Sequence, residues 1–180
     1  MQMDNGSNFA AKFSPLMLSM ASNNSETEAA RARLAAWDHR MDGEKAEPIL
    51  FLSWMRELTR LVYQDELKDQ FASRWRFHPV FMEQALTGVE GKEVWCDNIA
   101  TEDTIETCAE LVDEALTKAL ADAKSRFGDD MDSWRWDEAH PVVNRHIPGS
   151  FLPILGDALT IARPSSGGNH TINRGQHSIG

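Results

Sequence analysis

Residues 101–128 read TEDTIETCAELVDEALTKALADAKSRFG, and the rest of the chain is interpreted outward from this run. Its apolar residues recur at three- and four-residue steps, the spacing at which side chains share one face of an α-helix. They are Ile105, Cys108, Leu111, Val112, Ala115, Leu116, Ala119, Leu120 and Ala123. Thr101 or Asp103 is the predicted N-cap, and Gly128 is the predicted left-handed stop. The run therefore predicts one long amphipathic helix with an alanine-rich face that permits close helix packing.

Two helices are predicted further upstream from the same periodicity. The broad apolar face over residues 49–62 predicts a helix that begins just beyond Pro48. Residues 9–20 predict an earlier helix in which Pro15 is a kink or an early stop, because proline has no N–H to donate.

Two more helix starts are indicated by capping signals. Ser25 followed by Glu28 has capping-box spacing, so a helix is expected from there to about Trp37. His78-Pro79 is expected to open another helix, since proline suits the first helical position. The polar residues 1–8 are expected to be frayed.

The pattern changes after Gly128. Prolines and a glycine pair make long helices improbable there, so loops and short strands are expected. Residues 165–180 are interpreted either as a frayed tail or as a strand whose partner is missing. The predicted fold class is mostly α with a few strands (α+β), with residues 1–128 helical and residues 129–180 irregular or strand-containing.

Bulk properties exclude several classes of function. A chain of 180 residues with 42% hydrophobic and 26% charged residues fits one globular domain. The formal net charge of -10 argues against a nucleic-acid partner, which needs clustered lysine and arginine. No apolar run approaches the roughly 20 residues of a membrane span, and the first residues carry no signal-peptide pattern. The two cysteines form no C-x-x-C motif and leave the compartment open.

A metal site is one hypothesis for the histidines near the C-terminal end. His140 and His146 lie close to Asp137 and Glu138, and these are metal-ligand residue types. Ligands on one helix face need a spacing of three or four, whereas the two histidines are six apart across a proline. Structural or solvent-facing histidines are the favoured interpretation.

Nucleophilic and anion-binding sites receive no better support. Residues 149–151 lack the second glycine of a G-x-S-x-G elbow. Residues 165–168 favour a plain turn over a phosphate loop, which would want a following helix and usually a lysine. Trp134-Arg135-Trp136 could stack a ligand, but packing is the favoured role. The residues alone assign no catalytic, cofactor-binding or metal-binding position.

Three segments, here called the landmark segments, carry a resemblance to a known family. Residues 34–42, LAAWDHRMD, are similar to the "L-x-x-W-D-G" turn of penicillin amidase large chains, with His39 where glycine is common. Residues 134–146, WRWDEAHPVVNRH, are similar to that family's "W-x-W-G" followed by spaced histidines, with Asp137 in place of glycine. Residues 167–173, GGNHTIN, resemble the "G-G-x-x-T-V-N" segment that returns to the central sheet. The order of the three segments also matches.

The resemblance implies an N-terminal-nucleophile hydrolase that cleaves amides of N-acyl compounds such as penicillins, cephalosporins or acyl-homoserine lactones. In that family a precursor cuts itself and exposes a serine whose own α-amino group serves as base. The nucleophile, the oxyanion-hole asparagine and the calcium ligands belong to upstream regions of the family sequence, so none is carried over. The expected architecture is the outer helical region of an incomplete αββα fold, from the later part of the large (β) chain.

The implied function is that of an amide hydrolase fragment, inactive alone, with an N-acyl small molecule as the substrate of the intact family. Expected partners are the rest of the acylase or a second copy, with no nucleic acid and no membrane. The family is commonly periplasmic, although this chain shows no signal peptide. The alternative is an independent helical binding protein or a small metalloenzyme that uses His140 and His146.

Overall fold

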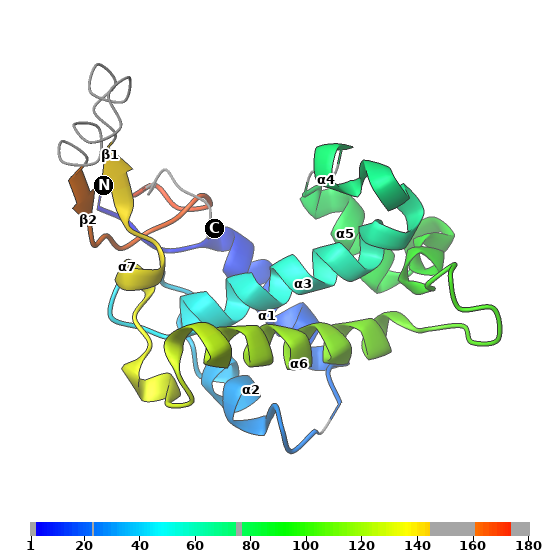
Figure 1. Cartoon of the computed structure of the whole chain (residues 1–180), viewed down its shortest axis with the longest axis horizontal. Helices are drawn as coiled ribbons and strands as arrows, with labels where there is room; N and C mark the ends of the chain where they lie inside the picture. The colour runs from blue at the N-terminus through cyan, green and yellow to red at the C-terminus, as the bar shows by residue number, and fades with distance from the viewer. Residues whose placement is uncertain (1–2, 23, 75–76, 145–160, 174–180) are drawn as a thin grey trace. The chain divides into compact units, whose positions relative to one another are not determined.

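A computed structural model describes residues 3–22, 24–74, 77–144 and 161–173 (Figure 1). The α-helices of these residues are α1 (Asn8–Met20), α2 (Glu28–Ala35), α3 (Glu47–Leu67), α4 (Phe71–Arg74), α5 (Pro79–Thr87), α6 (Cys108–Phe127) and α7 (Trp136–Ala139). The 3-10 helices are η1 (Lys68–Gln70), η2 (Val89–Cys96) and η3 (Met131–Ser133), and the strands are β1 (Val142–Asn144) and β2 (Ile161–Arg163). The predicted class, mostly α with a few strands, is confirmed.

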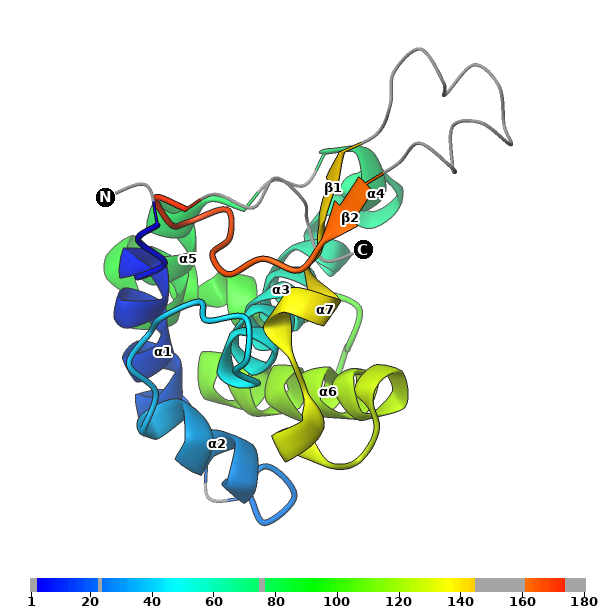
Figure 2. The same ribbon diagram turned by 90° about the vertical axis from the view of Figure 1, so that its left-hand side faces the viewer.

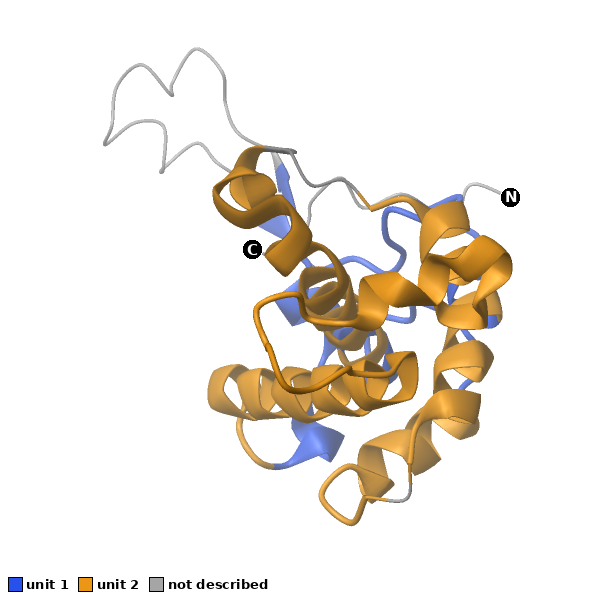
Figure 3. Cartoon of the chain, turned by 90° about the vertical axis from the view of Figure 1, so that its right-hand side faces the viewer, with its two compact units in different colours: residues 1–11, 37–49, 130–180 blue, residues 12–36, 50–129 orange. Residues whose placement is uncertain are grey.

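The chain divides into two compact units whose segments alternate along the sequence (Figure 3). Unit 1 contains residues 1–11, 37–49 and 130–180, and unit 2 contains residues 12–36 and 50–129. No helix formed by the described residues is both long enough and apolar enough to cross a membrane.

Unit 2 is built on the pairing of α3 with α6, which lie side by side (Figure 1). Trp54 of α3 is fully buried, and its indole Nε1 donates to the carbonyl oxygen of Val112 on α6 at 2.8 Å. The buried residues of α6 are Cys108, Leu111, Val112, Ala115, Leu116, Ala119, Leu120 and Ala123. The predicted apolar stripe is therefore confirmed from Cys108 onward.

The start of α6 differs from the prediction. The N-cap is Thr107, not Thr101 or Asp103, and it forms a capping box with Glu110. The Thr107 hydroxyl accepts from the Glu110 N–H at 3.3 Å, and the Glu110 carboxylate accepts from the Thr107 N–H at 2.7 Å. Two free amides are satisfied at once by this exchange, so the helix begins there. Ile105, placed on the helix by its spacing, precedes α6 and is 82% exposed.

Other helix boundaries are partly as predicted. Pro15 lies inside α1, so the early stop does not occur. The capping box at Ser25 is wrong, because Thr27 precedes α2 and makes no side-chain cap bond. The Asn24 side chain instead accepts from the Glu26 N–H at 2.9 Å, a local turn that delays the helix. The end of α2 at Ala35 falls short of the expected Trp37.

A proline and a glycine correctly predicted the start of α5 and the end of α6. Pro79 occupies the start of α5, with His78 as N-cap, as expected. Gly128 follows α6 and its N–H donates to the Lys124 carbonyl at 2.8 Å. Its φ of 91° and ψ of 169° are a positive-φ conformation outside the left-handed helical region, so the stop is confirmed but its conformation is not.

A disulfide joins Cys96 to Cys108 within unit 2, with a Cα–Cα distance of 4.9 Å and a sequence separation of 12. Cys96 ends η2 and Cys108 is the first residue of α6. The bond therefore ties the loop between them to the helix start, a state of the cysteines that the sequence had left open.

Unit 1 contains the only strand pair among the described residues, β1 with β2 (Figure 2). The pair is antiparallel and places Val142 opposite Arg163. Beyond Gly128 the described residues contain the short helices η3 and α7 as well as loops and these two strands, so the expectation of loops and short strands alone is wrong there. Residues 164–173 form turns and bends instead of the strand considered for that segment, and residues 174–180 lie outside the described residues. The expected fraying of residues 1–8 is wrong for Asn5 and Ser7, which are each 5% exposed.

The capping box of α6 leads to a stability prediction. Thr107→Ala is expected to lower the free energy of unfolding by about 1 kcal/mol, since it leaves the Glu110 N–H without its cap. Urea denaturation followed by circular dichroism measures the loss. Thr104→Ala, an exposed neighbour of the same type, is the matched control and should change stability by less than about 0.5 kcal/mol. Equal effects of the two substitutions would contradict the assignment of Thr107 as the cap.

Tyr63 gives a pH prediction that can be measured directly because it is the single tyrosine of the chain. The ring stacks on Phe81 and meets Trp95 edge to face, and burial raises the pKa of Tyr63 from 10.0 to about 12. The tyrosinate absorbance is expected to appear near pH 12 in the folded chain and near pH 10 in denaturant. Stability from Tyr63 should be complete below pH 10 and fall as the pH rises toward 12. Tyr63→Phe removes this contribution, so an unchanged alkaline loss in that variant would assign it to other groups.

Candidate functional site

Unit 1 brings parts of the three landmark segments together through the backbone N–H and carbonyl of Gly167. The Gly167 N–H donates to the Met41 carbonyl at 2.7 Å. The Gly167 carbonyl accepts from the indole Nε1 of Trp136, also at 2.7 Å. One residue of the third segment is therefore bonded to the first segment through its N–H and to the second segment through its carbonyl oxygen.

The turn after the first landmark segment also holds the start of α7. The Trp136 N–H donates to the Lys45 carbonyl at 3.2 Å, and the Asp137 N–H donates to the Gly43 carbonyl at 3.0 Å. These bonds satisfy two amides that a helix start leaves free. A Cβ added to Gly43 would lie 2.8 Å from the Asp137 Cβ, so this close approach requires glycine.

The tryptophans of the second landmark segment are packing residues. Trp134 is 2% exposed and Trp136 is fully buried. His140 is 3% exposed and stacks flat on Trp136, with ring centroids 4.5 Å apart and an interplanar angle of 9°. These three side chains therefore take part in the packing of unit 1, as the sequence favoured.

The acidic residues considered as metal ligands face an arginine. The Arg135 guanidinium lies 3.1 Å from the Asp137 carboxylate and 3.5 Å from that of Glu138. The hydrogen bond from Arg135 to Asp137 raises the pKa of Arg135 above its ordinary value. Among the described residues no group of three or more His, Cys, Asp or Glu is placed to hold a metal ion. His146 lies outside the described residues.

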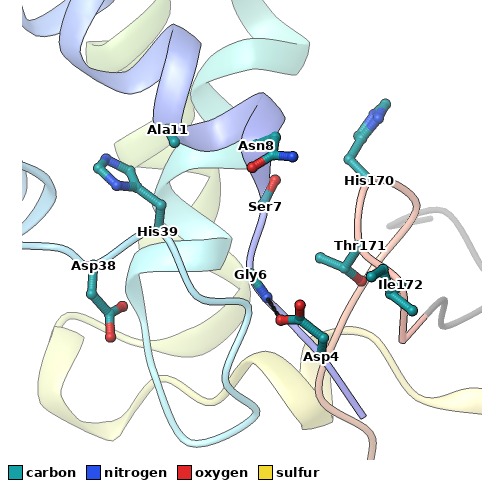
Figure 4. A pocket seen from close by; sticks show the side chains of 10 residues that line it. All are labelled: Asp4, Gly6, Ser7, Asn8, Ala11, Asp38, His39, His170, Thr171 and Ile172. Carbon is teal, nitrogen blue, oxygen red and sulfur yellow. Dashed lines mark hydrogen bonds between the residues drawn. The ribbon is translucent and has the colours of Figure 1, made fainter. Parts of the chain in front are cut away.

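A shallow polar cavity of about 360 Å³ opens beside these segments in unit 1 (Figure 4). Its lining residues are Asp4, Gly6, Ser7, Asn8, Ala11, Asp38, His39, His170, Thr171 and Ile172. The first and third landmark segments and the start of α1 therefore all contribute. This cavity is a candidate ligand site formed by described residues of unit 1.

Polar side chains around the cavity mainly accept hydrogen bonds from backbone N–H groups. The Ser7 hydroxyl accepts from the Ala10 N–H at 3.1 Å and caps α1. The Asp4 carboxylate accepts from the Gly6 N–H at 3.0 Å. His170 stacks on Phe9, with centroids 4.4 Å apart. These three contacts pair no nucleophile with a base among the described lining residues.

His39 has a backbone conformation that favours glycine. Its φ is 59°, in the left-handed region, and its ring lies 5.3 Å from the Trp37 ring. Glycine is common at this position in the family that the sequence resembles, which fits the conformation. The histidine thus adds a side chain to the cavity at a position where the backbone is strained.

The N-terminal residues 4–8 also contribute to this site, which was not predicted from the sequence. The Met41 N–H donates to the Asn5 carbonyl at 2.8 Å, and the Asn173 N–H donates to the Asp4 carbonyl at 2.8 Å. The Asn5 side chain also donates to the Asp42 carboxylate. One signal was available, since Ser7 directly precedes the apolar periodicity of α1 and is a preferred N-cap type. The long-range bonds of Asp4 and Asn5 have no sequence signal.

Comparison with known families supports the resemblance. The family model described as penicillin amidase matches residues 1–180. The chain belongs to the penicillin amidase family. A search of curated proteins found no match. The convergence of the landmark segments is therefore a feature of a penicillin amidase family chain.

Gly167 provides a test of this convergence. Its φ is 94°, and a Cβ there would lie 1.9 Å from the Asn173 carbonyl oxygen. Gly167→Ala is therefore expected to cost about 3 kcal/mol or more of unfolding free energy, since strain adds to the loss of two hydrogen bonds. Denaturation curves measure this loss.

Gly91→Ala is the matched control. Gly91 has a φ of 72° but no atom within 4 Å of the added Cβ, so only the backbone strain of about 1 kcal/mol is expected. A Gly167→Ala variant as stable as Gly91→Ala would show that the close packing around Gly167 contributes little.

Proposed function

We propose that this chain serves as scaffold in an amide hydrolase of the penicillin amidase family that acts on N-acyl compounds such as β-lactams or acyl-homoserine lactones. The supporting observation is the family match over residues 1–180, together with the buried hydrogen bonds that join the landmark segments. Bonds of this kind fix the backbone and position neighbouring elements.

The environments of four described serines favour a scaffold role over a catalytic one. Ser7 caps α1, and Ser166 accepts from the Gly43 N–H at 2.9 Å. Ser14 and Ser53 are 0% and 3% exposed. The family reaction requires an accessible serine with a free α-amine, so we assign no catalytic, cofactor-binding or metal-binding role to the described residues. The proposal places the nucleophile, the oxyanion-hole asparagine and the calcium ligands in sequence other than these 180 residues.

The proposed architecture follows from the same family. Residues 1–128 supply outer helices of an αββα fold, and residues 129–180 supply its irregular, strand-containing continuation. The proposed partners are the rest of an acylase or a second copy of the chain, and the proposed substrate of the assembled enzyme is an N-acyl small molecule.

Amidase assays test the proposal. The purified chain is incubated with penicillin G and with an N-acyl-homoserine lactone, and the released amine is measured by chromatography. No turnover above a heat-denatured sample is expected. The coding sequence that adjoins this chain is then expressed together with it, and this longer product is expected to hydrolyse at least one N-acyl substrate.

The two assays separate the two parts of the proposal. Turnover by the chain alone that is lost when one of its own serines is replaced by alanine would contradict the scaffold role. A folded longer product without any amidase activity would contradict the hydrolase assignment. Loss of the activity of the longer product in Gly167→Ala, with Gly91→Ala active, would support the role of the landmark segments in positioning.

A further inference from the structure

Unit 2 carries a surface cavity of about 630 Å³ that the amide hydrolase proposal does not use. It lies between the end of α5, η2 and the residues that lead into α6. We call it the acidic groove. The lining residues that matter here are Leu86, Val94 and Ile105, which are apolar, and Glu93, Asp97 and Glu106, which are acidic.

The apolar part of the acidic groove is open to solvent. Ile105 is 82% exposed and Val94 is 63% exposed, whereas Leu86 is 6% exposed. Burying such exposed aliphatic side chains against a partner is favourable, because it removes their apolar surface from water. These two residues therefore offer an apolar contact to a binding partner.

The charge of the acidic groove selects the kind of partner. Its lining contains three carboxylates and neither lysine nor arginine. Residues 86–108 contain six carboxylates and one lysine, a net charge of -5, and that lysine, Lys92, is paired with Glu90. A second copy of a chain with net charge -10 would bring further negative charge to this surface, which disfavours self-association there. A cationic partner is complementary.

The carboxylates are held in place. Glu106 accepts from the Asn98 N–H at 3.0 Å and from the Thr101 hydroxyl, and the bond from Asn98 keeps the pKa of Glu106 below its ordinary value. The Asp97 carboxylate accepts from the Glu106 N–H at 3.1 Å. Hydrogen bonds therefore hold both carboxylates in place.

Covalent and backbone constraints keep the acidic groove in shape. The Cys96–Cys108 disulfide closes the loop on one side, and the Thr107 capping box fixes the helix start beside it. Gly88, with a φ of 70°, turns the chain from α5 into η2. A preformed groove loses less conformational entropy on binding than a flexible one.

We propose that the acidic groove binds a basic amphipathic peptide segment of a partner protein, with aliphatic side chains of that segment on Val94 and Ile105 and its lysine or arginine residues on Glu93, Asp97 and Glu106. Such a segment can bury the apolar residues of the acidic groove and pair with its carboxylates at the same time.

Peptide titration tests the proposal. The probe is a short helix-forming peptide of leucine and lysine with its leucines on one face, and the comparison peptide has glutamate in place of lysine. Fluorescence anisotropy of the labelled peptides with the full chain is expected to show saturable binding of the lysine peptide alone. Binding should weaken as salt is raised, because part of it is electrostatic.

Substitutions on the acidic groove separate its two contributions. Ile105→Ser is expected to weaken binding about tenfold, as expected for loss of a buried aliphatic contact. Glu93→Gln is expected to weaken binding roughly threefold at low salt and less at high salt. Both residues are exposed, so neither change should affect folding.

Matched controls lie outside the acidic groove. Val80→Ser removes an aliphatic side chain that is 66% exposed, and Glu102→Gln removes an exposed carboxylate; both should leave peptide affinity unchanged. Equal affinity for the lysine and glutamate peptides, or an unchanged affinity in Ile105→Ser, would overturn the proposal. A simple alkylammonium ion that binds as tightly as the peptide would overturn it too, as would a dimer in sedimentation that Ile105→Ser dissolves.

Discussion

The hydrogen bond from the Trp136 indole to the Gly167 carbonyl is the interaction on which unit 1 depends. Both groups are buried, so each would lose a water partner without gaining another if the bond were absent. The Gly167 N–H also donates to the Met41 carbonyl, which makes Gly167 the link between chain segments more than a hundred residues apart. The positive φ and the close Asn173 carbonyl restrict this position to glycine. The landmark segments, which carry the family resemblance, are thus joined by hydrogen bonds in the folded chain.

Unit 2 is stabilised differently, by side-chain packing along regular helices. The apolar stripe of α6 meets α3, and the Trp54 indole finds its acceptor in the Val112 carbonyl. The burial of this stripe follows from periodicity, since a helix with apolar residues at three- and four-residue steps must cover that face. The penicillin amidase family chain therefore combines a helical unit specified by its pattern with a unit specified by individual hydrogen bonds.

This difference explains what the sequence could predict. The long helices, the start of α5 at Pro79 and the packing role of Trp136 were predictable, because each follows from local spacing or from residue type. The α6 cap was misplaced because Thr101, Asp103 and Thr107 are all acceptable cap types, and the choice rests on the reciprocal bond to Glu110. The rim of the unit 1 cavity was not predictable, since the contacts of Asp4 and Asn5 are long-range backbone bonds without a side-chain pattern.

The disulfide between Cys96 and Cys108 has a further consequence for the integrity of the chain. The residues between the two cysteines include the exposed Ile99 and Ile105, and exposed loops of this kind are preferred sites of proteolytic nicking. A single cut within this loop would leave its two products covalently joined, with α6 still attached to η2. The nicked molecule would keep the mass of the intact chain plus one water, and only a reductant would release its parts.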